Sequence, residues 1–551
     1  MGRTDRAVAL AAVWWLALVT VTLLTRPYVP VDETRYLAVA WEMRVTGEYL
    51  VPHLNGALYG HKPPLMFWLI NAGWAVFGVN EWWPRLIVTA FGLAALLLTA
   101  RIAALALPGR EQAPGLAVLV TGGALLWAVF ATMVMFDLML TTFAALAMLG
   151  LLRAGRGELG RGFLIFGLGI GLGVLSKGPA ILLHTLPAAL LAPLWLRQRP
   201  AGGWGRWYLW VLGGFLVGAA VALAWAVPAA VAGGEAFREE IFWKQSANRM
   251  VQSFAHRKPL WWYLPMLPLM LFPWLFWAPL WKGFAALARS VRAGPADGPA
   301  QPGVRFALAW ALPGLLAFSM ISGKQMQYLL PEFPAFGLLA AAALLAAPPV
   351  VRRWHQVLPA FALAGLAVYL VVDPGARMTE IVPAAGRPWV LASAAACGAL
   401  AVGVLLAQPR SIAAGAALLG TATVGAVVAL QAGFGSAVAY AYDVHPVARH
   451  LAEVQAQGQP VAHIGKYHGQ FQFPGRLRQP LQVIAEEGVA DWAARNPGGV
   501  VVGYTEPDEA PASPTRLSQR YRGQAAHVWA AADLRGGART GGHASGDEPE
   551  K

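Results

Sequence analysis

A series of apolar runs, each long enough to cross a lipid bilayer, is the feature that most constrains the fold of this chain. An apolar helix of about 20 residues matches the hydrocarbon thickness of a bilayer. Of the 551 residues, 57% are hydrophobic and 13% are charged, whereas a soluble protein carries about 25% charged residues. The sequence therefore predicts an all-α polytopic membrane protein, with its transmembrane domain over residues 1–431.

Thirteen of these runs are predicted to be membrane-spanning helices. A fourteenth run, at residues 65–80, begins after Pro63 and Pro64, and we expect it to form an interfacial or re-entrant helix. The first run follows Arg3 and Arg6 and is too long for a signal-peptide core, so a retained first helix is predicted. The predicted spans are residues 7–25, 86–106, 115–132, 138–152, 162–175, 179–196, 207–231, 262–281, 306–321, 328–347, 356–372, 388–407 and 411–431.

Charged residues divide the loops between these spans into two sets. With thirteen helices, the basic clusters around Arg101, Arg153 and Arg352 fall on the side of the N-terminus, as the positive-inside rule requires of the cytoplasmic side. The other side receives acidic, basic and aromatic residues close to helix ends. Charges kept beside hydrocarbon usually form pairs or line cavities. The functional site is therefore expected on the non-cytoplasmic side.

The net charge of +14 does not indicate a nucleic-acid partner, because the basic residues form short clusters between apolar runs. The expected surroundings are membrane lipids. Cys397, the only cysteine, lies in an apolar run, so no intramolecular disulfide is possible.

Two long loops and the C-terminal region lie on the non-cytoplasmic side in this topology. Loops 26–64 and 232–261 mix charged and aromatic residues, which is typical of helices in the membrane interface. Beyond them, a small soluble α/β domain is predicted over residues 432–535, followed by a disordered tail over 536–551. The predicted strands of this domain are residues 461–464, 500–504 and 526–530.

The first of these loops combines an acidic pair with a conformationally restricted lysine. Asp32 and Glu33 follow the first predicted helix, and Arg35 comes within one helical turn. Lys62 precedes two prolines, which restrict the backbone. Such groups at one membrane face suit a site that binds an anion and activates a hydroxyl group.

Each candidate also has a purely structural interpretation. Asp32 and Asp137 are at helix starts, where Asp is a preferred cap, and Glu33 is typical of a solvated helix charge. Basic residues at helix ends commonly extend towards lipid headgroups. This alternative applies to Lys62, Lys177 and Lys324.

Five sequence boxes follow one another along the first two-thirds of the chain. They are DETRY (32–36), TGEYLVPHLNGALYGHKPPL (46–65), FDLML (136–140), SKGP (176–179) and QMQYLLPEFP (325–334). In this ordered set the chain resembles the lipid-carrier-dependent glycosyltransferases of the GT-C fold, and within them the bacterial aminoarabinose lipid A transferase family. A more distant similarity is to protein O-mannosyltransferases. The resemblance implies a bacterial inner-membrane protein whose active site and C-terminal domain face the periplasm.

The resemblance also implies a reaction, in which a sugar moves with inversion from polyprenyl (undecaprenyl) phosphate to a periplasm-facing acceptor such as lipid A or another envelope glycan. Asp32 is then the expected base or acceptor-orienting group, with Asp137 and Glu33 as the further catalytic carboxylates. Because the leaving phosphate gains negative charge, fixed cations favour the transition state. The expected phosphate-binding residues are Lys62, Arg35, Lys177, Arg249, Arg257, Lys324 and Tyr328. The residues expected to line the substrate site are Tyr36, Tyr59, His61 and His256.

One position departs from the pattern of the family. His61 stands before Lys-Pro-Pro where these transferases often have a glutamate that helps to hold a metal ion. A divalent metal is therefore left open, and the histidines show no paired metal-ligand motif.

Two other classes of protein share part of this pattern. A lipid or sugar transporter or flippase also has many helices and buried charges, but transporters tend to bind substrate at mid-membrane between repeats. A ligase that transfers a whole glycan from a lipid-linked donor uses the same phosphate chemistry, and the sequence separates it poorly from a transferase of single sugars.

Overall fold

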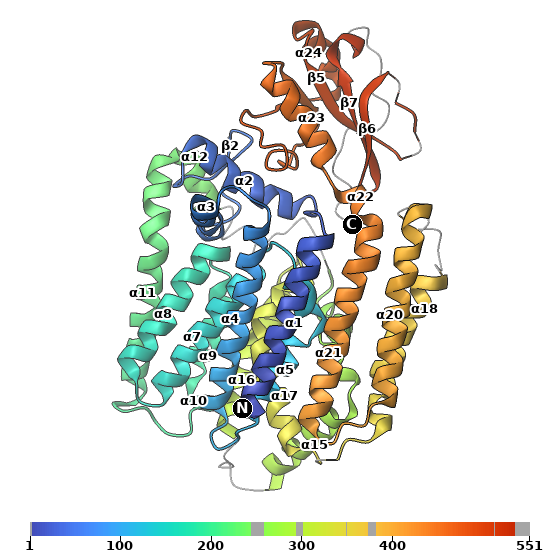
Figure 1. Ribbon diagram of the computed structural model, residues 1–551. Helices are drawn as coiled ribbons and strands as arrows, with labels where there is room; N and C mark the ends of the chain where they lie inside the picture. Colours follow the sequence, from blue (N-terminus) through green and yellow to red (C-terminus); the bar gives the residue numbers. More distant parts are fainter. Residues whose placement is uncertain are drawn as a thin grey trace.

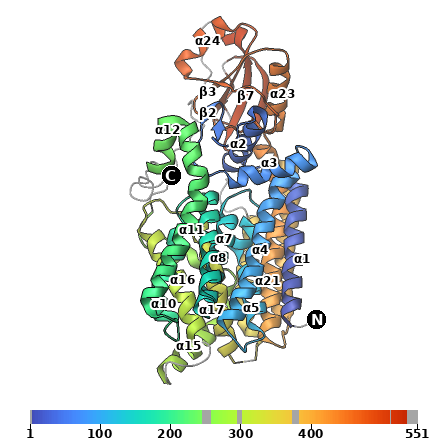
Figure 2. The same cartoon turned by 90° about the vertical axis from the view of Figure 1, so that its left-hand side faces the viewer.

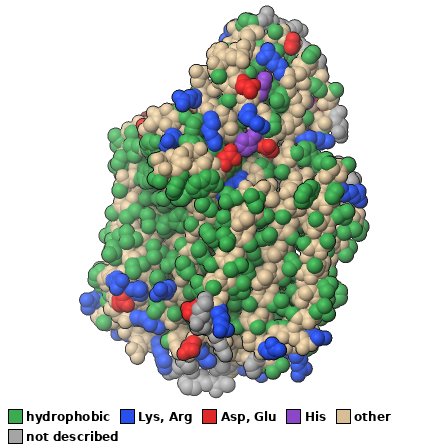
Figure 3. All heavy atoms as spheres, in the orientation of Figure 1, with side chains coloured by type: hydrophobic (Ala, Val, Ile, Leu, Met, Phe, Trp, Pro, Cys, Tyr) green, Lys and Arg blue, Asp and Glu red, His purple; other side chains and the backbone are tan. Residues whose placement is uncertain are grey.

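The computed structural model describes residues 3–243, 258–293, 301–348, 350–372, 382–507, 509–511 and 513–534. A bundle of long helices forms one end of the molecule, and a small sheet domain stands on the other (Figure 1). Apolar side chains cover the visible face of the bundle, and Lys and Arg side chains lie at its end away from the sheet domain as well as near that domain (Figure 3). The predicted fold, a polytopic helical membrane protein with a small C-terminal α/β domain, is therefore confirmed.

Within the described residues, ten helical segments are long and apolar enough to cross a membrane, and they coincide with ten of the thirteen predicted spans. They contain α1 (Arg3–Thr25), α4 (Trp82–Ala106), α7 (Asp137–Gly155), α8 (Leu159–Lys177), α11 (Gly203–Ala232), α16 (Gln301–Met320), η3 (Met326–Glu332) with α17 (Phe333–Ala346), η4 (Arg353–Gln356) with α18 (Val357–Val372), η5 (Ala384–Gly386) with α20 (Arg387–Leu406), and α21 (Ile412–Leu430).

The other three predicted spans are interrupted helices, so the number of crossings stays a prediction. They contain α5 (Ala113–Gly122) with α6 (Leu125–Phe130), α9 (Ile181–Leu190) with α10 (Ala192–Trp195), and α14 (Tyr263–Met270) with η2 (Trp274–Phe276) and the start of α15 (Ala278–Ala293). Two of the interruptions lie together, because the Leu125 amide donates to the Phe272 carbonyl at 2.9 Å. Pairing of this kind satisfies backbone groups that lipid would leave without a partner.

Short elements between α1 and α4 lie at the end of the bundle and contact the sheet domain. They are α2 (Asp32–Thr46), strands β1 (His53–Leu54) and β2 (Ala57–Leu58), and α3 (Leu65–Phe77). Helix α3 lies across the bundle axis, seen end-on in Figure 1 and from the side in Figure 2, as expected for an interfacial helix. Its Gly73 permits contact with the Trp83 indole, since a Cβ there would lie 1.8 Å from the ring nitrogen. Further along the chain, α12 (Gly234–Glu239) follows α11.

The C-terminal domain contains a five-stranded sheet with the order β4-β3-β5-β7-β6. Strand β3 is parallel to β4 and β5, whereas β7 is antiparallel to β5 and β6. Alternate residues of β5 face opposite sides: Val500 and Val502 pack with α23, and Val501 packs with α24. The elements are α23 (His445–Ala456), β3 (Val461–Ile464), β4 (Gln482–Ile484), η7 (Glu486–Gly488), α24 (Val489–Arg495), β5 (Val500–Thr505), β6 (Thr515–Tyr521), β7 (Gln524–Ala530) and η8 (Ala531–Leu534).

The chain enters this domain without a break at residue 431. The π-helical turn η6 (Gln431–Gly435) continues α21 into α22 (Ser436–Tyr442), so the predicted domain boundary stays a prediction. The domain also packs on α2 and α3. The Phe473 ring stacks on Trp74 of α3 at 5.0 Å, and the Trp41 indole of α2 donates to the Leu477 carbonyl.

Candidate active site

A cavity of about 1550 Å³ lies where the bundle meets the C-terminal domain. Pockets for single small molecules usually measure about 300–1,000 Å³, so this one has room for more than one such molecule. Nine of the predicted site residues line it: Asp32, Arg35, Tyr36, Tyr59, His61, Lys62, Asp137, Lys177 and Tyr328.

Asp32 is the first residue of α2, and its carboxylate faces the cavity without capping the helix. Val31 occupies the cap position, and no side-chain cap bond forms there. The carboxylate pairs with the Arg35 guanidinium one turn along and lies 3.4 Å from the Tyr36 hydroxyl. Its side chain is 46% exposed. The geometry thus favours an accessible, oriented carboxylate over a helix cap.

Asp137 starts α7 and is buried in an ion pair with Lys177, the last residue of α8. The Lys177 Nζ lies 2.5 Å from Asp137 Oδ1, and the Asp137 side chain is 2% exposed. The same ammonium lies 4.8 Å from the centroid of the Tyr328 ring. A buried charge needs such a partner, so Lys177 does not extend towards lipid headgroups.

The Phe136 ring contacts groups on both sides of the site, although nothing in the sequence distinguishes it from its apolar neighbours. The Lys62 Nζ lies 5.8 Å from its centroid, and the Tyr36 ring meets it edge-on at 4.8 Å. Because Phe136 directly precedes Asp137 in the chain, this one side chain fixes Lys62 and the start of α2 relative to the buried pair.

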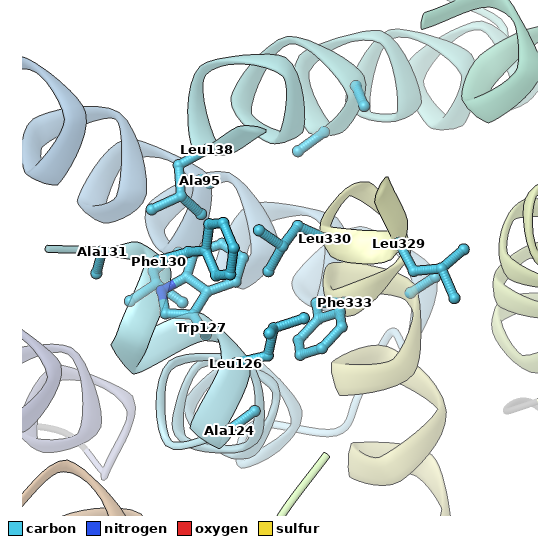
Figure 4. Close-up of a cluster of buried hydrophobic side chains, with 14 of the residues drawn as sticks. Ala95, Ala124, Leu126, Trp127, Phe130, Ala131, Leu138, Leu329, Leu330 and Phe333 are labelled. Carbon is cyan, nitrogen blue, oxygen red and sulfur yellow. The ribbon is translucent and has the colours of Figure 1, made fainter. Parts of the chain in front are cut away.

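A cluster of buried apolar side chains includes residues that lie next to Asp137 and Tyr328 in the chain. Figure 4 shows Leu138 and Leu330 directed towards Trp127 and Phe130 of α6. Leu138 directly follows Asp137 in the chain, and all four of these side chains are buried. The short helix α6 is therefore a support for the site.

Glu33, predicted as a catalytic carboxylate, does not line the cavity. Its side chain is 1% exposed and pairs with the Arg26 guanidinium at 2.7 Å. It also accepts from the Val29 amide at 2.8 Å and the Val134 amide at 2.6 Å. These bonds join three segments of the fold, so a structural role replaces the predicted catalytic one.

Lys324 also differs from its predicted role in binding phosphate. Its ammonium donates to the Lys258 carbonyl at 3.0 Å and the Ile321 carbonyl at 2.5 Å, and it is not among the residues that line the cavity. Arg249, Arg257 and His256 lie outside the described residues.

Sequence reasoning missed two groups of cavity residues. His184 lines the cavity, and its Nδ1 lies 2.6 Å from Glu332 Oε1, with both side chains buried. The only signal was the position of Glu332 within the box at 325–334. The other group comes from the C-terminal domain and consists of Lys466, Tyr467, His468 and Arg522.

The metal left open by the sequence finds no suitable ligand set in the described part of the chain. No group of three or more His, Cys, Asp or Glu side chains gathers there at metal-binding distance. His61, at the position where the family often has glutamate, lies 3.9 Å from Glu240. The side chains that the structure describes therefore do not form a metal site.

The helical bundle with its C-terminal sheet domain has a fold that is known from solved structures. The fold matches crystal structures of ArnT from Cupriavidus metallidurans, in the apo state with a TM-score of 0.75 and bound to undecaprenyl phosphate with a TM-score of 0.72. Each match has 20% sequence identity and covers 95% of this chain and 97% of the other. The family model for dolichyl-phosphate-mannose-protein mannosyltransferases matches residues 61–231.

Sequence comparison gives the particular resemblance. The chain is 32% identical over 343 residues to an undecaprenyl phosphate-alpha-4-amino-4-deoxy-L-arabinose arabinosyl transferase of Sodalis glossinidius, covering 60% of this chain and 58% of the relative. It is 30% identical over 321 residues to the protein of that name from Serratia proteamaculans, covering 56% and 54%. The match thus spans little more than half the length of these relatives. The chain is thus similar to aminoarabinose transferases over this length, and the predicted resemblance is confirmed.

Proposed function

We propose that this protein is a glycosyltransferase that moves a sugar from undecaprenyl phosphate to an acceptor such as lipid A, at the periplasmic face of a bacterial inner membrane. The observation that carries the proposal is the convergence of Asp32, Lys62 and Asp137 on one cavity. The relatives named above act on a 4-amino-4-deoxy-L-arabinose donor, which makes this sugar the first one to test.

The cations of the bundle suit the departure of a lipid phosphate. As the bond to the sugar breaks, negative charge grows on the phosphate, and fixed positive charge lowers the energy of that state. Lys62 is the candidate for direct contact, with Arg35 and Lys177 on the same cavity wall. A phosphate departs without a general acid, so no protonated carboxyl group is required.

Asp32 is the proposed base. Its carboxylate is accessible and is oriented by Arg35, whereas that of Asp137 is committed to Lys177. It takes the proton from the attacking oxygen of the acceptor, or orients that oxygen where the acceptor is already ionised. Attack from the face opposite the phosphate is a single displacement, which inverts the configuration at the sugar carbon.

An apolar wall gives the isoprenoid chain a place beside the charged groups. Leu223, Trp225 and Ala226 of α11 line the cavity together with Ile241 and Phe242. A carrier lipid with its phosphate at Lys62 can thus keep its hydrocarbon against apolar side chains, where burial is favourable.

The position of the charges along the helices argues against a transporter. Asp137 is the first residue of α7 and Lys177 is the last residue of α8, so the ion pair lies at the end of the bundle and not midway along it. Transporters place their sites near the bilayer midplane. The gathering of Lys and Arg at the opposite end (Figure 3) supports the proposed orientation through the positive-inside rule.

The proposal is tested with the purified full chain in proteoliposomes. The donor is undecaprenyl phosphate-linked 4-amino-4-deoxy-L-arabinose, the acceptor is lipid A, and mass spectrometry detects the added pentosamine. Arg516→Gln serves as the control, because Arg516 is an exposed residue of strand β6. Wild type and this control should give product, and Asp32→Asn should give none above background. Equal transfer by wild type and Asp32→Asn would remove the assigned site. Failure of the wild type with every polyprenyl-phosphate sugar would remove the proposed function.

A further inference from the structure

The wall that the C-terminal domain contributes to the cavity is basic. Lys466, Tyr467 and His468 follow strand β3, and Arg522 lies in the turn between β6 and β7. All four line the cavity, and among the described residues the domain adds no carboxylate to the lining.

The charges of the whole lining show why this wall matters. Among the residues that the structure describes, five cations and two carboxylates line the cavity, a net charge of +3 with histidine neutral. The cations are Arg35, Lys62, Lys177, Lys466 and Arg522. Both carboxylates are paired with bundle cations, Asp32 with Arg35 and Asp137 with Lys177. The C-terminal domain thus contributes two of these five cations, Lys466 and Arg522.

The loop that bears Lys466 is held firmly against the element that bears Asp32. Gly469 has a φ of +78°, and a Cβ there would lie 2.6 Å from Leu54 Cδ1 and 2.9 Å from Ala38 Cβ of α2. Nearby, the Gln472 side-chain amide donates to Asn55 Oδ1 at 2.9 Å. The loop and α2 are thus in close contact, and the basic wall has a fixed place relative to the proposed base.

Arg522 is positioned by its backbone. It has a φ of +55°, a conformation that a residue with a Cβ adopts only at a cost. Its amide donates to the Ala441 carbonyl of α22 at 2.7 Å. The turn is therefore anchored to the helix that continues from α21, and the guanidinium is carried on a fixed part of the domain.

We infer that Lys466 and Arg522, with His468 beside them, bind a phosphate group of the acceptor, while Lys62 binds the phosphate of the donor. This inference rests on the proposed function and adds the residues that select the acceptor. One carrier phosphate is served by the bundle cations, so a second cationic group on a separate domain matches a second anion. Arginine and lysine together suit a phosphate monoester, because a guanidinium can bind two of its oxygens at once.

A second phosphate has another chemical source, namely the pyrophosphate of a differently linked donor. The acceptor is favoured because the basic wall belongs to the C-terminal domain, whereas Lys62 lies just before α3 and the apolar wall and Lys177 belong to helices of the bundle. The experiment therefore compares both kinds of ligand.

The test uses the purified full-length protein and the variant Lys466→Gln/Arg522→Gln. Its matched control is Arg495→Gln/Arg516→Gln, which removes two exposed charges of the same domain away from the cavity. Affinities are measured for bisphosphorylated lipid A, for enzymatically dephosphorylated lipid A, for undecaprenyl phosphate and for undecaprenyl pyrophosphate. Wild type and control should prefer phosphorylated over dephosphorylated lipid A by about tenfold or more. The variant should lose this preference while binding undecaprenyl phosphate as wild type does.

Each other outcome has a defined meaning. A variant that keeps the preference, or a wild type that has none, overturns the inference. A loss confined to undecaprenyl pyrophosphate also overturns it and assigns the basic wall to the donor. Should the double variant unfold, Lys466→Gln alone, on an exposed loop residue, provides the same comparison. The proposed function fails separately if wild type does not bind undecaprenyl phosphate, and the assignment of Lys62 to the donor phosphate fails if Lys62→Gln binds it equally well.

Discussion

Two carboxylate–cation pairs line the same cavity, but their surroundings differ. At the start of α2, Asp32 pairs with Arg35, and the two side chains are 46% and 26% exposed. Where α7 begins and α8 ends, Asp137 pairs with Lys177, and the side chains are 2% and 13% exposed. An exposed pair contributes about 0–1 kcal/mol to stability, whereas breaking a buried pair costs about 3–5 kcal/mol. The first pair is therefore suited to chemistry, and the second to holding the site together.

Asp32→Asn is the sharpest test of this difference and should have the largest effect on activity. The amide cannot take a proton, so kcat should fall by about 10²–10⁴-fold, while the free energy of unfolding changes by less than about 1 kcal/mol. Sugar transfer and thermal unfolding in detergent measure the two quantities. A stable variant with at least half of the wild-type kcat would contradict the role assigned to α2.

Asp137→Ala should show the reverse pattern, with stability affected first. It leaves the Lys177 ammonium buried without its carboxylate, and we expect a loss of about 3–5 kcal/mol in the free energy of unfolding. Asp137→Ala/Lys177→Met removes both charges and should recover much of that stability without recovering transfer. If the single variant unfolds at the wild-type temperature, the pair is not the structural element described.

Gly469→Ala disturbs the contact of the C-terminal domain with α2 and leaves both ion pairs unchanged in sequence. The new Cβ meets Leu54 and Ala38 at 2.6 and 2.9 Å, an overpacking that should cost about 1–3 kcal/mol. Transfer should decline through a raised KM for the acceptor, while the affinity for undecaprenyl phosphate is kept. Gly458→Ala is the control, since that glycine also has a positive φ but meets nothing within 4 Å. If both variants show the same effect, the decline in transfer comes from backbone strain and not from the contact with α2.

Arg35→Gln should have the smallest effect on stability. The exposed pair with Asp32 is worth less than about 1 kcal/mol, so the unfolding transition should barely move. Lys177→Gln, the matched change in the buried pair, should lower the unfolding temperature markedly. If the two variants unfold alike, the contrast drawn from their exposure is wrong.

Local sequence predicted much of this site because its parts lie next to helix ends. An acidic pair indicates Asp32, and a proline pair indicates Lys62. Each of these signals lies within a few residues of the side chain that it indicates. Glu33 shows the limit, because successive residues on a helix point about 100° apart. The sequence could not tell which member of the acidic pair faces the cavity and which turns inward to Arg26.

The parts that the sequence did not reveal depend on contacts between distant segments. His184 and Glu332 meet across 148 residues. Lys466 and Arg522 reach the cavity only because the C-terminal domain packs on α2 and the hairpin of β1 and β2. The interrupted helices escaped detection for a different reason. Their breaks are as apolar as their helices, so hydropathy alone reads each as one continuous span.

The paired breaks at Leu125 and Phe272 also constrain how the protein is made. The early break, between α5 and α6, finds its hydrogen-bond partner in a segment that is synthesised only after α11 has left the ribosome. The hydrogen bond at this break is therefore complete only when a segment beyond α11 is in place, so the two halves of the bundle depend on each other for a paired backbone at this point.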